Sequence, residues 1–328
     1  MSAWKGKRVL VTGAGGFIGS HLTERLVELG ATTRAFVHYR SNGAWGWLEE
    51  SARREDMEVV AGDIIDRDAV THAMRDVDIV FHLAALIAIP YSYHAPASYV
   101  STNVQGTLNV LQAAREAGVA RVIHTSTSEV YGTARYTPID EAHPLQGQSP
   151  YSATKIGADK LVEAFTLSYG LPVVTVRPFN TYGPRQSSRA IIPTIMTQCL
   201  TDAKVRLGNL SPTRDMNYVV DTVEGFIKAA LVPEAVGRTF NIGSGREIRI
   251  AELADLIARL AGKSIEVEQV VERVRPESSE VERLVADTTA ARKVLQWEPA
   301  YSLEEGLKVT LEWVQGHLDL YRAGVYVL

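Results

Sequence analysis

The chain contains 328 residues, which is enough for one large domain or two fused domains and too many for a single small core. Its 34 lysine and arginine residues and 38 aspartate and glutamate residues give a net charge of −4, so the charge balance does not point to a nucleic-acid or membrane partner. Hydrophobic residues make up 46% and charged residues 22%, which is typical of globular proteins and excludes a disordered or fibrous chain.

The first half of the chain alternates short β-branched runs with longer amphipathic stretches. We expect strands at residues 8–11, 33–37, 58–61, 78–83, 120–125 and 172–177. We expect helices between them at 17–29, 66–75, 98–117 and 151–169. Strand–helix alternation of this kind favours βαβ crossovers, so the sequence predicts an α/β fold built on a doubly wound parallel sheet.

The pattern loosens after Pro178. We expect a loop at 178–190 and an irregular, Gly- and Pro-containing stretch at 208–214. The other expected elements are helices near 191–201, 221–231, 250–261, 288–295 and 303–318, and short strands at 205–207 and 239–242. We interpret this half as a smaller mixed domain over the carboxyl edge of the sheet. The larger domain would comprise 1–177 and about 215–242, and the smaller one 178–214 and 243–328.

Cysteine content and hydropathy indicate the type of protein and the compartment in which it is expected. The single cysteine, Cys199, cannot form an internal disulfide or a cysteine-based zinc cluster, and no other metal-ligand cluster is evident. The opening residues MSAWKGKRVLV lack an apolar segment ending in a cleavage site. The most apolar stretch, residues 79–89, is too short to span a bilayer. We therefore expect a soluble, cytoplasmic protein without a metal site.

A glycine-rich segment, Thr12-Gly13-Ala14-Gly15-Gly16-Phe17-Ile18-Gly19, lies between the first expected strand and the first expected helix. Gly13, Gly16 and Gly19 have the spacing that permits a tight turn, close backbone approach to a pyrophosphate and close helix–strand packing. The amino end of the helix adds free N–H groups that suit a dianion. In this context the motif predicts a dinucleotide site, and a plain tight turn is the alternative.

The end of the second expected strand bears on the choice between NAD and NADP. NAD sites usually carry Asp or Glu there to hold the ribose hydroxyls, whereas this segment reads His38-Tyr39-Arg40-Ser41. Arg40 and Ser41 would suit a 2′-phosphate, so the sequence weakly favours NADP over NAD, unless Arg40 is only a solvated loop residue. Asp63, after the third strand, is placed to meet the adenine, and Asp66 is the more natural cap for the helix that follows.

Tyr151 and Lys155 stand four residues apart at the start of an expected helix, so their side chains share one face. A phenol with a pKa of about 10 is a poor base at neutral pH. A neighbouring ammonium and the positive ring of an oxidised nicotinamide would favour its phenolate. Tyr151 is then a candidate to deprotonate an alcohol while hydride leaves the same carbon. Because such pairs also occur by chance on protein surfaces, the segment upstream is needed to interpret this pair as catalytic.

The fifth expected strand leads into Ser126-Thr127-Ser128-Glu129-Val130-Tyr131-Gly132, at the edge where open α/β sheets bind ligands. With this segment the chain resembles the extended short-chain dehydrogenase/reductases, in particular the NAD-dependent epimerase/dehydratase family. The resemblance covers nearly the whole chain and includes the glycine loop, Asp63, His82–Ala85, Asn103, Tyr151–Lys155, Arg177–Pro184, Thr213–Asp215 and Asn241–Gly243. It implies a Rossmann domain with a smaller mixed C-terminal substrate domain, and hydride transfer on a sugar nucleotide.

The resemblance also implies residue roles. Thr127 would hold the substrate hydroxyl, Tyr151 would act as the base, and Lys155 would orient the ribose and tune Tyr151. The residues expected at the cofactor are Gly13, Gly16, Phe17, Ile18, Gly19, Arg40, Asp63, Ile64, Leu83, Ala84, Ala85, Tyr151 and Lys155. Those expected at the substrate are Asn180, Arg185, Arg214 and Arg275. Arginine forks suit diphosphate oxygens, and structural ion pairing is the alternative for them.

Glu129 bears on which reaction is carried out. A 4-epimerase needs only Thr127, Tyr151 and Lys155, whereas 4,6-dehydratases of the family carry a glutamate at this position. Once C4 of the sugar is a ketone, a carboxylate can remove the acidified C5 proton while the C6 hydroxyl leaves as water. Ser128 stands where dTDP-glucose dehydratases have aspartate, so it would relay a proton through Glu129 or a water. UDP-glucuronate decarboxylases share the Ser-Glu pair, and a structural loop carboxylate is a further alternative.

Residues 86–96 and 144–150 are similar to segments of GDP-N-acetylglucosamine 4,6-dehydratases of legionaminic-acid-type pathways. The resemblance therefore implies an NAD(P)-dependent 4,6-dehydratase of GDP- or UDP-linked N-acetylglucosamine. A decarboxylase and a 4-epimerase are the alternatives within the class, and a non-catalytic NAD(P)-binding regulatory protein is the alternative outside it. The resemblance also implies a homodimer through helices 98–117 and 151–169, which carry apolar residues on more than one face.

Overall fold

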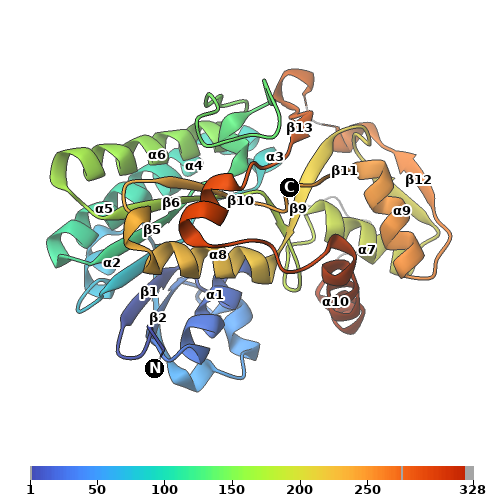
Figure 1. Ribbon diagram of the computed structural model, residues 1–328. Helices are drawn as coiled ribbons and strands as arrows, with labels where there is room; N and C mark the ends of the chain where they lie inside the picture. Colours follow the sequence, from blue (N-terminus) through green and yellow to red (C-terminus); the bar gives the residue numbers. More distant parts are fainter. Residues whose placement is uncertain (1, 275, 322–328) are drawn as a thin grey trace.

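The structure is a computed structural model that describes residues 2–274 and 276–321. Seven parallel strands form its main sheet, in the order β10-β6-β5-β4-β1-β2-β3 (Figure 1). They are β1 (Arg8–Thr12), β2 (Thr32–His38), β3 (Met57–Gly62), β4 (Ile79–His82), β5 (Arg121–Thr125), β6 (Val173–Pro178) and β10 (Thr239–Ile242). The order reverses at β1, which confirms the predicted doubly wound Rossmann sheet.

Helices cover both faces of this sheet. They are α1 (Phe17–Glu28), α2 (Arg67–Ala73), α3 (Ile89–His94), α4 (Pro96–Tyr99), α5 (Gly106–Ala117), α6 (Pro150–Tyr169) and α8 (Val219–Leu231). Helices α1 and α8 pack together on one face, and α2, α5 and α6 lie on the other (Figure 1). The strands are apolar on both sides for this reason: Val9 and Val11 join the core under α1, and Leu10 joins the core under α6.

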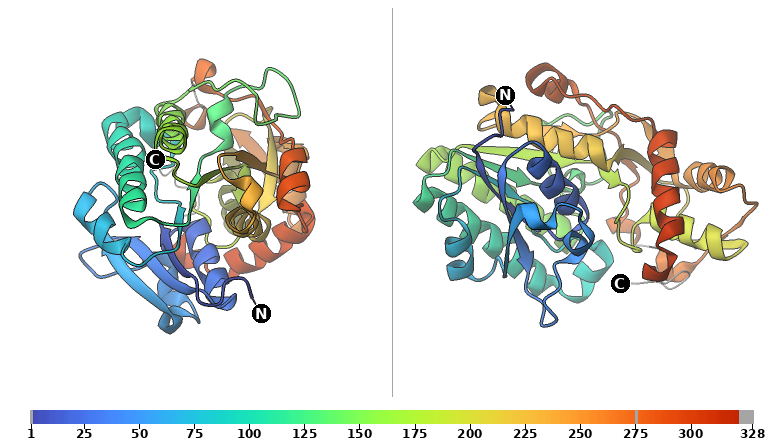
Figure 2. Two further views of the ribbon diagram at one scale, coloured as in Figure 1. Left: turned by 60° about the vertical axis from the view of Figure 1, so that its left-hand side comes forward. Right: turned by 90° about the horizontal axis from the view of Figure 1, so that it is seen from below.

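A second, smaller region of mixed structure lies beside the carboxyl ends of these strands (Figure 2). In its four-stranded sheet, β9 (Thr213–Tyr218) pairs in parallel with β7 (Asn180–Tyr182) and β13 (Arg283–Leu284), and antiparallel with β11 (Glu247–Arg249). A separate ribbon joins β8 (Lys204–Leu207) to β12 (Glu266–Gln269). Its helices are α7 (Ile191–Thr201), α9 (Ile250–Leu260) and α10 (Leu303–Gly316). The exact domain boundaries stay a prediction.

The structure corrects several expected elements. Strand β7 lies inside the expected loop at 178–190, and β9 begins inside the expected irregular stretch at 208–214, because both find partners far away in the chain. The helix expected at 98–117 starts with α4 and a π-helical turn at Val100–Gln105 before α5, and the one expected at 288–295 is a π-helical turn at Ala291–Leu295. In the part of the chain that the structure describes, no helix is both long and apolar enough to cross a membrane.

Candidate active site

One cavity of about 840 Å³ runs from the glycine loop along the carboxyl ends of the main-sheet strands and into the smaller region. It lies where the strand order reverses, which is the usual ligand site of open α/β sheets. All thirteen residues expected at the cofactor line it, as do Thr127, Ser128, Glu129, Asn180 and Arg214. Arg185 is not among the residues that line it, and Arg275 lies outside the described residues.

The glycine loop brings the start of α1 against β1 and the segment after β4. Gly13 has a φ of +73°, and a Cβ there would lie 2.8 Å from the backbone nitrogen of Ala84. A Cβ on Gly19 would lie 2.1 Å from the carbonyl oxygen of Gly13. Side chains are excluded at both positions. Helix α1 has no side-chain cap at its amino end, so its first N–H groups are open to an anion, and the cradle fits a dinucleotide pyrophosphate.

The far end of this cradle is formed by the ends of β2 and β3. Asp63 follows β3, and one of its oxygens lies 3.7 Å from Nδ1 of His38. Asp66 caps α2, as predicted, because its side chain accepts hydrogen bonds from the N–H groups of Asp68 and Ala69. Asp63 is therefore left at the cavity wall, together with the exposed Arg40.

Helix α6 places Tyr151 and Lys155 on one buried face. Pro150 occupies its first position and Ser149 forms a capping box with Ser152, so the helix starts one residue before Tyr151. The Nζ of Lys155 donates a hydrogen bond to the carbonyl of Thr125 at the end of β5, at 2.6 Å. The residues that define the start of α6 therefore also set the positions of the Tyr151 and Lys155 side chains.

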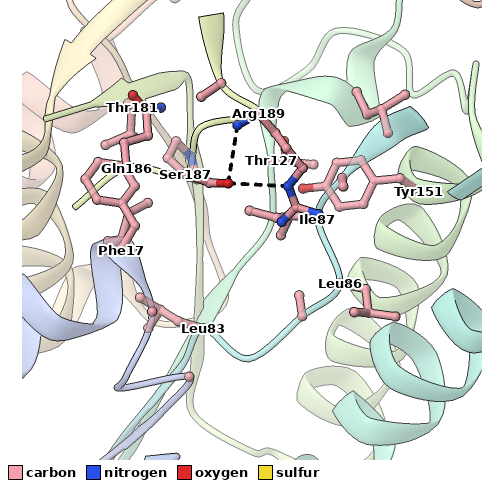
Figure 3. A pocket seen from close by; sticks show the side chains of 18 of the residues that line it. Phe17, Leu83, Leu86, Ile87, Thr127, Tyr151, Thr181, Gln186, Ser187 and Arg189 are labelled. Carbon is pink, nitrogen blue, oxygen red and sulfur yellow. Dashed lines mark hydrogen bonds between the residues drawn. The ribbon is translucent and has the colours of Figure 1, made fainter. Parts of the chain in front are cut away.

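The hydroxyl of Tyr151 points into the cavity and faces Thr127 (Figure 3). The other side of its ring packs edge-on against Tyr99, at 6.3 Å between ring centroids. Burial raises the pKa of Tyr151 above its ordinary value, the interaction with Thr127 opposes this, and the charge of Glu129 adds to it. Burial lowers the pKa of Lys155 to about 8. Tyr151 is therefore a neutral phenol that needs added positive charge nearby to act as a base.

Thr127 also shapes the segment that carries Glu129. Its hydroxyl oxygen accepts a hydrogen bond from the Glu129 N–H at 3.2 Å and caps the short 3-10 helix Ser128–Tyr131. Ser128 is buried, and Glu129 is half-buried in the cavity wall. The chain therefore presents a hydroxyl, a second hydroxyl and a carboxylate in succession at the end of β5, next to Tyr151.

A buried ionic cluster behind Lys155 was missed by the sequence reasoning. Asp159 lies one turn beyond Lys155 on α6, and one of its carboxylate oxygens accepts hydrogen bonds from Ser126 and from Arg177 of β6, at 2.8 and 2.9 Å. Burial acts to raise the pKa of Asp159, but His124, Arg177 and Lys155 together lower it to about 2. Tyr151, Lys155 and Asp159 stand at i, i+4 and i+8, and this spacing is the sequence signal that places Asp159 on the same face of the helix.

The substrate end of the cavity contains two arginines that the sequence did not predict. Arg189 and Arg273 line it together with Arg214, whose Nη2 lies 3.2 Å from a carboxylate oxygen of Glu280. Arg189 extends across the cavity toward Thr127, with its Nε 3.3 Å from the Ser187 hydroxyl (Figure 3).

The two other residues expected at the substrate differ from each other. The side-chain oxygen of Asn180 is buried without a hydrogen-bond partner among the described residues, which suits a ligand donor. Arg185 instead donates to both carboxylate oxygens of Glu24 on α1, at 2.8 and 3.0 Å. Its contacts are those of a structural ion pair, so the structure does not support its expected role at the substrate. No cluster able to hold a metal ion occurs within residues 2–274 and 276–321.

A doubly wound sheet with this glycine cradle and a Thr–Tyr–Lys constellation at its carboxyl edge defines an extended short-chain dehydrogenase/reductase. The family model described as GDP-mannose 4,6 dehydratase matches residues 10–310 of the chain. The chain therefore belongs to this family, within the NAD-dependent epimerases and dehydratases.

Its relatives carry out different reactions. The chain is 35% identical to a UDP-glucose 4-epimerase of Mycolicibacterium smegmatis, over 93% of this chain and 98% of that protein. It is 34% identical to a UDP-N-acetyl-alpha-D-glucosaminuronate decarboxylase of Bacillus cytotoxicus, over 94% and 97%. The crystal structure of a dTDP-glucose 4,6-dehydratase from Streptomyces venezuelae with NAD bound matches with a TM-score of 0.89 at 30% identity, covering 96% of this chain and 99% of that one. Overall similarity therefore does not choose among epimerase, decarboxylase and dehydratase.

Proposed function

We propose that this protein is an NAD-dependent 4,6-dehydratase of a nucleotide-activated hexose and releases a 4-keto-6-deoxy sugar nucleotide. The observation that carries the proposal is Glu129, a carboxylate in the cavity wall two residues after Thr127 and close enough to raise the pKa of Tyr151. A dehydratase needs such a second base, whereas a 4-epimerase does not. The similarity of residues 86–96 and 144–150 to GDP-N-acetylglucosamine dehydratases supports GDP- or UDP-linked N-acetylglucosamine as the substrate.

The cofactor is a nicotinamide dinucleotide, and we favour NAD. The cradle of Gly13 and Gly19 fits its pyrophosphate, and Tyr151 and Lys155 line the same cavity. The preference for NADP drawn from Arg40 has no support from the comparisons, because the similar Streptomyces structure contains NAD. When bound, the nicotinamide would accept the hydride of C4 and return it at C6, so no second substrate is consumed.

The residues of the chain divide the proton transfers between them. Thr127 holds the C4 hydroxyl, and Tyr151 takes its proton as the carbon becomes a ketone. Glu129 then removes the acidified C5 proton, and the C6 hydroxyl leaves as water, protonated by Glu129 directly or through Ser128. When C6 is reduced, C5 takes back a proton, which balances the one that Tyr151 removed from the C4 hydroxyl, so loss of one water is the only net change. Buried Ser128 is too weak an acid to supply that proton unaided, so it can only relay it.

Decarboxylation of a nucleotide-linked uronate is the second candidate. The observation in its favour is Arg189, a cation that extends over the cavity beside Thr127 (Figure 3). A guanidinium there would pair with a carboxylate on the sugar, which a neutral hexose lacks.

The test is a panel of GDP-N-acetylglucosamine, UDP-N-acetylglucosamine and UDP-glucuronate incubated with the purified chain and NAD, with products weighed by mass spectrometry. Loss of one water supports dehydration. Loss of carbon dioxide establishes the decarboxylase, and an unchanged mass with altered stereochemistry establishes the epimerase. The regulatory alternative is favoured if the unmodified protein binds NAD but converts none of the three compounds, so that it behaves as its Tyr151→Phe variant does.

The Glu129→Gln variant sharpens this test. It should form reduced nicotinamide from the sugar nucleotide but release at least 100-fold less dehydrated product, because the C5 proton has no acceptor. Glu312→Gln, the same change on the exposed face of α10, is the matched control and should behave as the unmodified protein. Equal dehydration by both variants would remove the ground for the proposal.

We also propose a homodimer through α5 and α6. Leu167 and Tyr169 near the end of α6 are 79% and 55% exposed, and Val100, the first residue of the π-helical turn that leads into α5, is 52% exposed. Large apolar side chains exposed along one helix pair are typical of an interface.

A further inference from the structure

The buried cluster behind Lys155 has no part in the proton transfers proposed above. It consists of Asp159 on α6 and the three residues that bind its carboxylate. Asp159 is 7% exposed, and the three donor residues are also buried. The donors are Ser126 Oγ at 2.8 Å, His124 Nε2 at 3.0 Å, and Arg177 Nη2 and Nε at 2.9 and 3.3 Å. A buried network in which one carboxylate accepts four hydrogen bonds holds its members in one arrangement.

The cluster matters for the site because two of its donors lie on either side of Thr125, which holds Lys155. His124 and Ser126 flank Thr125, whose carbonyl accepts the hydrogen bond of Lys155. Thr127, which faces Tyr151, follows Ser126 directly. One carboxylate on α6 therefore ties the end of β5 to the helix that carries both Tyr151 and Lys155.

The charges in the cluster also bear on Lys155. Three titratable groups interact with its charge: Asp159 on α6, His82 on β4 and His124 on β5. Arg177 on β6 interacts with Asp159 and His124, and Glu129 beyond β5 interacts with Tyr151. Burial lowers the pKa of His124, and its Nδ1 is buried without a hydrogen-bond partner among the described residues, so the ring is neutral. Burial likewise lowers the pKa of Lys155, and Asp159 is the group that opposes this. A buried ammonium keeps its proton only with such a partner.

We propose that Asp159 is a positioning residue that acts on Lys155 and Thr127 in two ways. As a tether, it fixes the backbone at 124–126, and with it the carbonyl that holds the Lys155 amino group. As a charge, it keeps that amino group protonated at neutral pH. The proposal rests on the proposed function only in that Lys155 contacts a bound nicotinamide nucleotide, and it is independent of which sugar reaction follows.

The charge is tested by the affinity for NAD as a function of pH, measured by calorimetry on the full chain. Affinity for NAD should fall at high pH as Lys155 loses its proton, which gives the pH profile an alkaline limb. Lys155→Gln should abolish this limb, and its loss would assign the limb to Lys155. Asp159→Asn keeps the shape but removes the charge, and should move the limb to lower pH by about one unit. Asp255→Asn, the same change at an exposed position of α9, should leave the limb in place. The proposal would be overturned if the NAD affinity of Asp159→Asn fell at the same pH as that of the unmodified protein.

The tether is tested separately with Ser126→Ala, which removes one hydrogen bond and keeps the charge. Turnover should fall several-fold while the alkaline limb stays in place, and a limb that moves as far as in Asp159→Asn would refute the assignment. If Asp159→Asn does not fold because Arg177 is left unpaired, the variant Asp159→Asn/Arg177→Met removes that unpaired guanidinium as well and should also move the limb to lower pH. If the chain proves not to be a dehydratase, the binding measurement still decides the role of Asp159.

Discussion

The closest backbone contact of the glycine loop gives a prediction whose size follows from the coordinates. In Gly19→Ala, the added methyl carbon would lie 2.1 Å from the carbonyl oxygen of Gly13 and 2.9 Å from its carbonyl carbon. Ordinary contact begins at 3.4 Å, so relief requires a movement of 3.4 minus 2.1, or 1.3 Å. Both partners are backbone atoms, so no side chain can turn aside, and α1 must move away from Gly13.

This movement opens the cradle proposed for the pyrophosphate, because one wall is the start of α1 and the other is the backbone at Gly13. Overpacking of this kind costs about 1–3 kcal/mol. A similar loss in binding corresponds to an affinity for NAD that is weaker by roughly 5- to 140-fold, since about 1.4 kcal/mol is a factor of ten. Calorimetric titration with NAD and thermal unfolding of the same samples measure the two effects.

The matched control for Gly19→Ala is Gly316→Ala. Gly316 is the last residue of α10, and a Cβ there meets nothing within 4 Å. Alanine should leave NAD affinity unchanged and stabilise the helix by up to about 1 kcal/mol. The reasoning fails if Gly19→Ala binds NAD and unfolds as the unmodified protein does.

Two further predictions concern side chains on opposite sides of the cavity wall. Arg189→Ala should raise the KM for the sugar nucleotide about tenfold with little change in melting temperature. Arg185→Ala should leave KM unchanged and lower the free energy of unfolding by about 1–2 kcal/mol, because the ion pair with Glu24 is lost. Steady-state kinetics and thermal unfolding on both variants check the pair, and reversed outcomes would reassign the two arginines. Asp66→Ala should cost about 1 kcal/mol in denaturant unfolding, because two N–H groups of α2 lose their cap, and an unchanged midpoint would contradict the assignment of that cap.

The main sheet was predictable because its strands are buried on both faces. Runs such as Val9-Leu10-Val11 are continuously apolar for that reason, and the helices between them keep one apolar face. Strand β9 shows the limit of this logic. It reads Thr-Arg-Asp-Met-Asn-Tyr, yet Asp215 within it is fully buried. Its carboxylate accepts backbone N–H groups of Ser244, Gly245 and Ala286, and a single sequence does not reveal partners so far along the chain.

The candidate site divides in the same way. Thr127, Tyr151 and Lys155 were found because each occupies a fixed place relative to a strand end or a helix start. Arg185 and Arg189 lie in one loop between β7 and α7, where no periodicity states which side chain faces the cavity. Asp159 shares the face of Lys155, but its partners sit on β5 and β6, and only the folded sheet brings them to it.

The charge balance around Tyr151 bears on the choice among the related reactions. The negative charge of Glu129 raises the pKa of Tyr151, as burial does, so it works against the first proton transfer. A 4-epimerase requires that transfer and no other at this edge of the cavity, and a neutral side chain at position 129 would serve it better. A dehydratase gains from the same carboxylate one step later, when the C5 proton must leave. The unfavourable effect of Glu129 on Tyr151 is offset if Glu129 moves a proton of its own, as the proposed elimination requires.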